Sequence, residues 1–219
     1  MPKAIYVINP NSSATVTSEL DAAVAPLRLP GGPEIRCVTL AEGPPGVESQ
    51  GDVDRAALAV QAFANAHRGE ASAFVIACFS DPGLHGLRET ENVPVLGISE
   101  SAVLTALSIG HSFGVIAILP RSIPRHLRNW GAMGVMQRCA GEIAIGRGVS
   151  ALADREATLA AMCDAGRRLR DERGAQVLVM GCAGMAPFRQ PLQEATGLPV
   201  VEPTQAAVAM ALGRVQLGW

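Results

Sequence analysis

The chain has 219 residues, of which 48% are hydrophobic and 17% are charged, and its formal net charge is −2. A chain of this length can bury a substantial core, either as one large domain or as two domains of about 100 residues. The weakly acidic charge balance offers no basic surface, so nucleic acid and anionic membranes are not expected as partners.

Hydropathy and cysteine usage indicate the compartment. No apolar run approaches the roughly 18 residues that a membrane span requires, and the first residues lead directly into a predicted strand. We therefore expect a cytoplasmic protein with no membrane segment. The cysteines are odd in number, widely spaced and never arranged as C-x-x-C, so we interpret them as reduced thiols: Cys37, Cys78, Cys139, Cys163 and Cys182.

The positions of the lysine and the histidines limit the kinds of catalysis that the protein can use. Lys3 is the only lysine and lies at the start of the first predicted strand, which argues against a Schiff base with pyridoxal phosphate in an internal cleft. The four histidines show neither H-x-x-x-H spacing nor clustering with carboxylates along the sequence, which leaves a catalytic metal without support: His67, His85, His111 and His126. We expect chemistry that uses the protein's own side chains.

The first half of the chain is predicted to alternate four strands with four helices. Short apolar runs bounded by Gly and Pro predict buried parallel strands at residues 4–8, 34–40, 73–77 and 93–97. Helices are predicted from the Asn9-Pro10-Asn11-Ser12-Ser13 turn to about residue 25, after Asp52, after Asp81-Pro82 as N-cap and first residue, and over about 99–108. The turn after the first strand could hold a carboxylate, carbonyl or imide of a ligand, although ordinary helix capping explains the same residues.

The second half repeats this order. Strands are predicted at residues 113–118, 142–145, 176–180 and 198–201, and helices after Pro120 to about 133, over 151–173, from Pro187 and from Thr204. Each half therefore reads βαβαβαβα, with crossovers long enough for right-handed parallel units. This repeat favours two domains.

A local sequence repeat marks the candidate site. The run Val75-Ile76-Ala77-Cys78 returns as Val179-Met180-Gly181-Cys182, and each run is followed by an apolar segment that contains Val-Pro or Leu-Pro. Both cysteines therefore lie where a strand gives way to a helix, which is where open α/β sheets bind their ligands. We expect the thiols of Cys78 and Cys182 to face each other across a cleft, whereas the other cysteines are interpreted as small buried hydrophobes.

Two facing thiols predict proton transfer at a carbon atom. One thiolate removes a proton from one face while the opposite thiol delivers a proton to the other, which inverts a stereocentre. A nearby helix N-terminus lowers the pKa of the Cys78 thiol and the Asp81 carboxylate raises it, so the sequence leaves the net value open. The enolate-like intermediate requires N–H donors, which the turns at 9–12, 79–80 and 183–184 can supply. Hydantoins, whose C–H is acidified by a carbonyl group and a ring nitrogen, fit this chemistry.

These motifs together resemble the hydantoin and allantoin racemase branch of the aspartate/glutamate racemase superfamily: Asn9-Pro10-Asn11-Ser12, Gly43-Pro44, Val47-Glu48-Ser49, Cys78-Phe79-Ser80-Asp81-Pro82-Gly83-Leu84 and Gly181-Cys182-Ala183-Gly184-Met185. The resemblance implies two flavodoxin-like domains with four-stranded parallel sheets and an active site between them. It implies domain boundaries at 1–97 plus 203–219 and at 98–202, with the helix of 99–108 and the terminal helix crossing to the other domain. It also implies no cofactor, a homo-oligomer, and Cys78 and Cys182 as acid/base residues that each serve one enantiomer.

The predicted substrate contacts extend beyond the two thiols. We expect them from Asn9, Asn11, Phe79, Ser80, Ala117, Gly181, Ala183 and Gly184. Related amino-acid racemases more often carry Thr or Asn after each cysteine, so Phe79 and Ala183 favour a neutral ring. Ala117-Ile118-Leu119 stands where relatives usually have threonine, which leaves the identity of the substrate open.

Other activities remain as alternatives. An amino-acid racemase, a maleate isomerase or an arylmalonate decarboxylase would use the same scaffold, but the decarboxylase needs only one cysteine and the maleate isomerase would need more polar groups. A non-catalytic two-lobed binding protein is a further alternative, because fold alone does not specify function.

Overall fold

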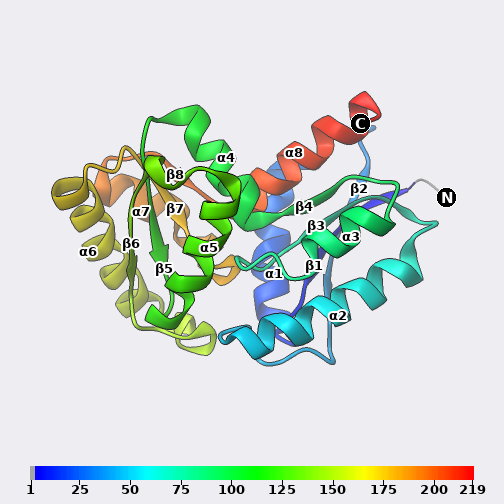
Figure 1. Ribbon diagram of the computed structural model, residues 1–219, viewed down its shortest axis with the longest axis horizontal. Helices are drawn as coiled ribbons and strands as arrows, with labels where there is room; N and C mark the ends of the chain where they lie inside the picture. The colour runs from blue at the N-terminus through cyan, green and yellow to red at the C-terminus, as the bar shows by residue number, and fades with distance from the viewer. Residues whose placement is uncertain (1–2) are drawn as a thin grey trace.

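The structure is a computed structural model that describes residues 3–219. It consists of two α/β lobes, each built on a sheet of parallel strands (Figure 1). The first sheet has the strand order β2-β1-β3-β4, formed by β1 (Ala4–Asn9), β2 (Glu34–Thr39), β3 (Ala71–Ile76) and β4 (Val95–Gly97). The second has the equivalent order β6-β5-β7-β8, formed by β5 (Phe113–Ala117), β6 (Cys139–Ala144), β7 (Val177–Met180) and β8 (Val200–Val201). The predicted pair of four-stranded parallel sheets is confirmed.

Helices alternate with the strands as predicted. They are α1 (Ala14–Val24), α2 (Gln50–His67), α3 (Leu84–Thr90), α4 (Ile98–Ile109), α5 (Ile123–Met133), α6 (Arg155–Arg173), α7 (Arg189–Thr196) and α8 (Pro203–Leu217). Local capping explains several starts: Ser13 accepts a hydrogen bond from the N–H of Val16, and Ser49 and Asp52 form a capping box. Helix α6 begins at Arg155 and not at 151, because residues 149–153 form a 3-10 turn and Asp154 caps the helix.

Each sheet is covered by apolar side chains on both faces. In the first lobe, α1 and α8 contribute Leu20 and Val208 to one face, whereas α2 and α3 contribute Val60 and Leu87 to the other. In the second lobe, α6 and α7 cover one face, and α4 and α5 cover the other. No helix within residues 3–219 is long and apolar enough to span a membrane.

Two helices cross from one lobe to the other. Helix α4 follows the last strand of the first sheet but packs against β5, β7 and β8, and α8 follows the last strand of the second sheet but packs against β1, β3 and β4 (Figure 1). The two crossing helices also pack on each other. The division into domains 1–97 plus 203–219 and 98–202 stays a prediction, and this exchange of helices supports it.

Asp81 joins the loop after β3 to the start of α4. Its carboxylate accepts hydrogen bonds from the N–H groups of Ser99 and Glu100, both at 2.9 Å, so it caps α4 across 18 residues of sequence. The prediction that Asp81 caps the next helix, α3, is wrong, because α3 begins only at Leu84, after Gly83. Asp81 has a φ of 45°, a left-handed conformation that aspartate tolerates better than most residues.

In the second lobe the equivalent helix, α8, is also capped by a carboxylate, but that carboxylate comes from a different position. Strand pairing places Glu202 at the point equivalent to Gly97, and the Glu202 carboxylate itself accepts hydrogen bonds from the N–H groups of Thr204 and Gln205. In the first lobe Asp81 occupies that space, so a Cβ atom at Gly97 would overlap its carboxylate. The Asp81 carboxylate can therefore occupy its capping position only while residue 97 is a glycine.

Because of this overlap, adding a single methyl group at position 97 is expected to destabilise the protein. Gly97→Ala is expected to lower the free energy of unfolding by about 2–3 kcal/mol, because it must displace the buried carboxylate that caps α4. Gly213→Ala is the matched control. Apart from the adjacent residues and the backbone of its own helix, α8, no atom of residues 3–219 lies within 4 Å of the added Cβ, so a gain of about 0.5–1 kcal/mol is expected. Urea denaturation measures both. Equal changes in the free energy of unfolding for the two substitutions would contradict an overlap between a Cβ at position 97 and the Asp81 carboxylate.

Candidate active site

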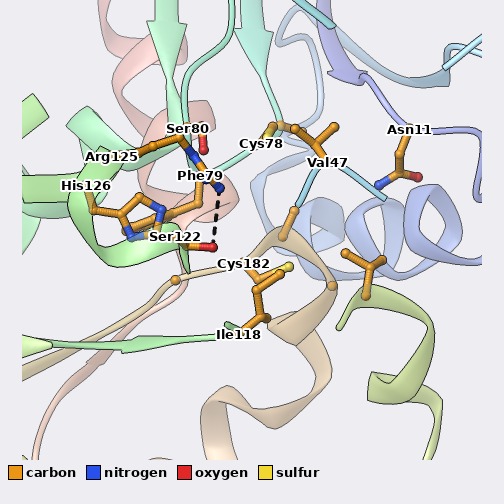
Figure 2. Close-up of a pocket in the computed structure, with 15 residues that line it drawn as sticks. Asn11, Val47, Cys78, Phe79, Ser80, Ile118, Ser122, Arg125, His126 and Cys182 are labelled. Atoms are coloured by element: carbon orange, nitrogen blue, oxygen red, sulfur yellow. Dashed lines mark hydrogen bonds between the residues drawn. The ribbon is translucent and has the colours of Figure 1, made fainter. Parts of the chain in front are cut away.

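A pocket lies between the lobes at the carboxyl ends of the parallel strands. Its lining includes Asn11 after β1, Cys78 after β3, Ile118 after β5 and Cys182 after β7 (Figure 2). About 440 Å³ between its atoms is unfilled, and part of this space is open to solvent. The pseudo-symmetric placement of the two cysteines follows directly from the repeated strand order.

The two thiols have closely similar surroundings. Burial raises the pKa of Cys78 to about 12, and a hydrogen bond from the N–H of Ser80 opposes that rise. Burial likewise raises the pKa of Cys182 to about 11, opposed by the N–H of Gly184. Each sulfur is therefore approached by the backbone N–H two residues further on. Both groups are thiols at neutral pH, and each has a donor in place for the transient thiolate.

Asn9 and Asn11 have different roles, although both were predicted to contact the substrate. Asn9 is fully buried and lies outside the pocket lining; its Nδ2 donates to Oδ1 of Asn11, to Oγ1 of Thr17 and to the carbonyl oxygen of Ser13. The same Oδ1 of Asn11 accepts the N–H of Ser13 at 2.9 Å. With its oxygen occupied, Asn11 presents Nδ2 as the donor available to a ligand. Asn9 therefore orients Asn11.

The end of β5 also differs from the prediction. Ala117 is fully buried and does not line the pocket, whereas the next residue, Ile118, does. Successive side chains of a strand point to opposite sides, so a shift of one residue exchanges a core position for a pocket position. The backbone of Gly181 lies close to this strand end: its N–H donates to the carbonyl oxygen of Ile116 at 2.8 Å, and an added Cβ would come within 3.2 Å of the Ala117 Cα. The other predicted contacts do line the pocket: Phe79, Ser80, Gly181, Ala183 and Gly184.

The start of α5 adds a polar wall that the sequence did not reveal. Ser122, Arg125 and His126 all line the pocket on the side of Phe79 (Figure 2). His126 Nδ1 lies 2.6 Å from Oε1 of Glu142 on β6, and both side chains are almost completely buried. Burial raises the pKa of Glu142, and the contact with His126 opposes the rise. The sequence pattern did not reveal this pair, because Glu142 lies on a neighbouring strand, 16 residues away from His126.

The loop after β2 closes the pocket from the first lobe. Val47 lines the pocket, and the Glu48 carboxylate binds the second lobe: Oε1 accepts the N–H of Val149 at 2.9 Å and Oε2 accepts from Arg121 at 2.7 Å. Val149 lines the pocket as well. The motif Val47-Glu48-Ser49 therefore ties the two lobes together beside the thiols.

Two parallel α/β lobes that each deliver one cysteine to a shared pocket define a class of two-lobed enzymes with paired thiols. A family model described as Asp/Glu/Hydantoin racemase matches residues 5–211. The chain is 36% identical to the hydantoin racemase of Rhizobium meliloti, over 98% of this chain and 90% of that protein. Two solved structures, the allantoin racemases of Klebsiella pneumoniae and Pseudomonas fluorescens, each superimpose with a TM-score of 0.92.

Those two racemase structures are 35% and 34% identical to this chain, respectively. The matches cover 99% and 98% of this chain, and 89% and 92% of the two structures. The protein therefore belongs to the Asp/Glu/hydantoin racemase family, and it is an isomerase of the racemase type. The resemblance identified from the cysteine motifs is confirmed.

Proposed function

We propose that this protein racemises 5-substituted hydantoins or allantoin by two-base proton transfer between Cys78 and Cys182. The observation that carries the proposal is the delivery of one thiol by each lobe to a single pocket, each with an N–H donor directed at its sulfur. The racemase relatives support the ring substrate, because they are named for hydantoin and allantoin. A cytoplasmic homo-oligomer, acting on a small molecule, is part of the same proposal.

The reaction needs one thiolate and one thiol at a time. The thiolate takes the proton from C5 of the ring, and the electron pair of that C–H bond moves toward the adjacent carbonyl oxygen. The opposite thiol then protonates C5 from its other face, and its sulfur becomes the thiolate. Atoms and charge balance, and the enzyme ends with the opposite cysteine deprotonated, ready for the other enantiomer.

The intermediate bears negative charge on the ring oxygen, which requires fixed donors. Asn11 Nδ2 is held by the network around Asn9, and it does not need to reorganise during the reaction. The backbone N–H groups of Ser80 and Gly184 complete the set next to the sulfurs. Phe79 and Ala183, which line the same pocket, provide apolar contacts to the body of the ring.

The proposal is tested by incubating single enantiomers of 5-benzylhydantoin and of allantoin with the protein in D₂O. Loss of optical activity together with deuterium uptake at the stereocentre is the expected result, in excess of the uncatalysed rate. Failure to accelerate either compound would refute the ring substrate, and arylmalonate, maleate and free amino acids would then be compared under the same conditions.

The raised pKa values of the two thiols predict how kcat/KM for racemisation depends on pH. Below the lower pKa, the fraction of enzyme that carries one thiolate grows tenfold per pH unit. Since burial raises these values to about 12 and about 11, log kcat/KM should rise by nearly one per unit between about pH 7 and 8.5. Polarimetric rates, corrected for the uncatalysed reaction, measure the slope. A plateau beginning near neutral pH would contradict the raised values.

A further inference from the structure

Arg125 is a buried cation in the pocket wall that forms no ion pair with a carboxylate of residues 3–219. Its side chain lies in the first turn of α5 and is only 8% exposed. Nη1 donates to the carbonyl oxygen of Arg121 at 3.1 Å, and Nη2 donates to the carbonyl oxygen of Glu48 at 3.3 Å. Nη2 also donates to Oγ of Ser122 at 3.3 Å (Figure 2). All three acceptors are neutral. The remaining donor, Nε, is buried and has no hydrogen-bond partner among residues 3–219.

Such a group is unusual inside a protein, because buried charges are almost always paired. Within the described part of the chain, no carboxylate forms an ion pair with Arg125. The Glu48 carboxylate is engaged by Arg121 and by the N–H of Val149, and the Asp52 carboxylate is engaged by Ser49 and Arg55. Neither carboxylate neutralises the guanidinium.

The helix itself adds to the positive potential. The N-terminus of a helix favours anions and disfavours cations, yet the first turn of α5 contains no acidic residue and does contain Arg125. Arg121 precedes the helix and Arg128 follows one turn later; both lower the pKa of Arg125, as burial does more strongly. The Cys78 thiolate form acts in the opposite direction. The carboxylates of Glu142 and Asp52 are near enough to interact with the guanidinium, but Glu142 is paired with His126 and neither forms an ion pair with Arg125 within residues 3–219.

We propose that Arg125 binds a carboxylate carried by the substituent at C5 of the substrate, so that the preferred hydantoins have short acidic side chains. This inference rests on the proposed function and deepens it by naming the substituent. With C5 between the two sulfurs, a substituent directed to the Phe79 side meets the guanidinium and the start of α5. A guanidinium offers planar paired donors to a carboxylate, and the ring itself remains neutral, as Phe79 and Ala183 favour.

The test compares two isosteric substrates, 5-(2-carboxyethyl)hydantoin and 5-(2-carbamoylethyl)hydantoin, which differ in charge and not in size. The wild type is expected to prefer the carboxylate by about 30-fold in kcat/KM, the size of a charge-assisted interaction. Arg125→Gln should abolish this preference, and Arg125→Lys should keep part of it because the charge remains. Arg128→Gln is the matched control: it removes the same charge from an exposed position on the same helix and should keep most of the preference.

Equal losses with both substrates in Arg125→Gln, with the pH profile displaced upward, would overturn the proposal, since Arg125 would then act on the Cys78 thiolate. A wild type that prefers neither substituent would overturn it as well. Calorimetric binding of both ligands provides a readout that does not depend on turnover. If the wild type racemises neither ring but binds the carboxylate more tightly in an Arg125-dependent way, the anion site stands and the proposed function fails.

Discussion

Replacement of either Cys78 or Cys182 by alanine is expected to lower kcat/KM for racemisation by at least about 10³-fold in both directions. Each direction of the reaction needs one thiolate and one thiol on opposite faces, so no single remaining sulfur completes an inversion. The remaining thiolate can still remove and return a proton on its own face. Each variant should therefore exchange the C5 proton of one enantiomer with D₂O, without inversion, and the two variants should select opposite enantiomers.

Proton NMR of each enantiomer in D₂O measures this exchange directly. Cys37→Ala is the matched control, because this half-buried thiol lies on β2, outside the pocket lining, and should leave racemisation unchanged. Racemisation that survives in Cys78→Ala or in Cys182→Ala would refute the two-base mechanism. Exchange of both enantiomers by one variant would show that a single group reaches both faces.

Asp81→Ala is expected to lower the free energy of unfolding by about 3 kcal/mol. The substitution removes the acceptor of two hydrogen bonds from the N-terminus of α4 and leaves the N–H groups of Ser99 and Glu100 without their partner. Activity should fall as well, because Asp81 ties the loop that carries Cys78 to the helix that covers the second lobe. Urea denaturation, together with the rate of racemisation, measures the two effects.

A matched control separates capping from the loss of charge. Asp54 is an exposed aspartate of α2 that is hydrogen-bonded to the side chain of Gln50, and Asp54→Ala should change stability by less than about 0.5 kcal/mol. Similar stability for the two alanine variants would rule out the cap as a major contributor. Asp81→Asn should be intermediate, since one side-chain oxygen remains as an acceptor.

Local patterns along the chain were sufficient to predict both sheets. Buried parallel strands appear as continuous apolar runs between Gly and Pro, and that signal does not depend on distant residues. The repeated cysteine motif then indicated the pocket, because parallel strands of one topology must deliver equivalent positions to equivalent places. The contribution of Phe79, Ser80, Ala183 and Gly184 to the lining follows from the same reasoning.

Some elements had a local signal that was assigned to the wrong partner. Asp81-Pro82 is typical of a helix start, yet the carboxylate turns back and caps α4, because α4 returns its N-terminus to the same loop. Ala117 was predicted to face the pocket, but the next residue, Ile118, does so, since a strand end alone does not specify which side chain faces the pocket.

The amino-acid sequence by itself determined the two-lobed parallel fold, the pair of thiols and the family, because these depend on periodicity and on motifs of contiguous residues. Only the tertiary structure revealed the polar wall of Ser122, Arg125 and His126, the pairing of His126 with Glu142, and the Glu48 tie between the lobes. These groups come together from separate strands, loops and helices. Whether a charge is buried and whether it has a partner are properties of that packing, and no spacing along the chain encodes them.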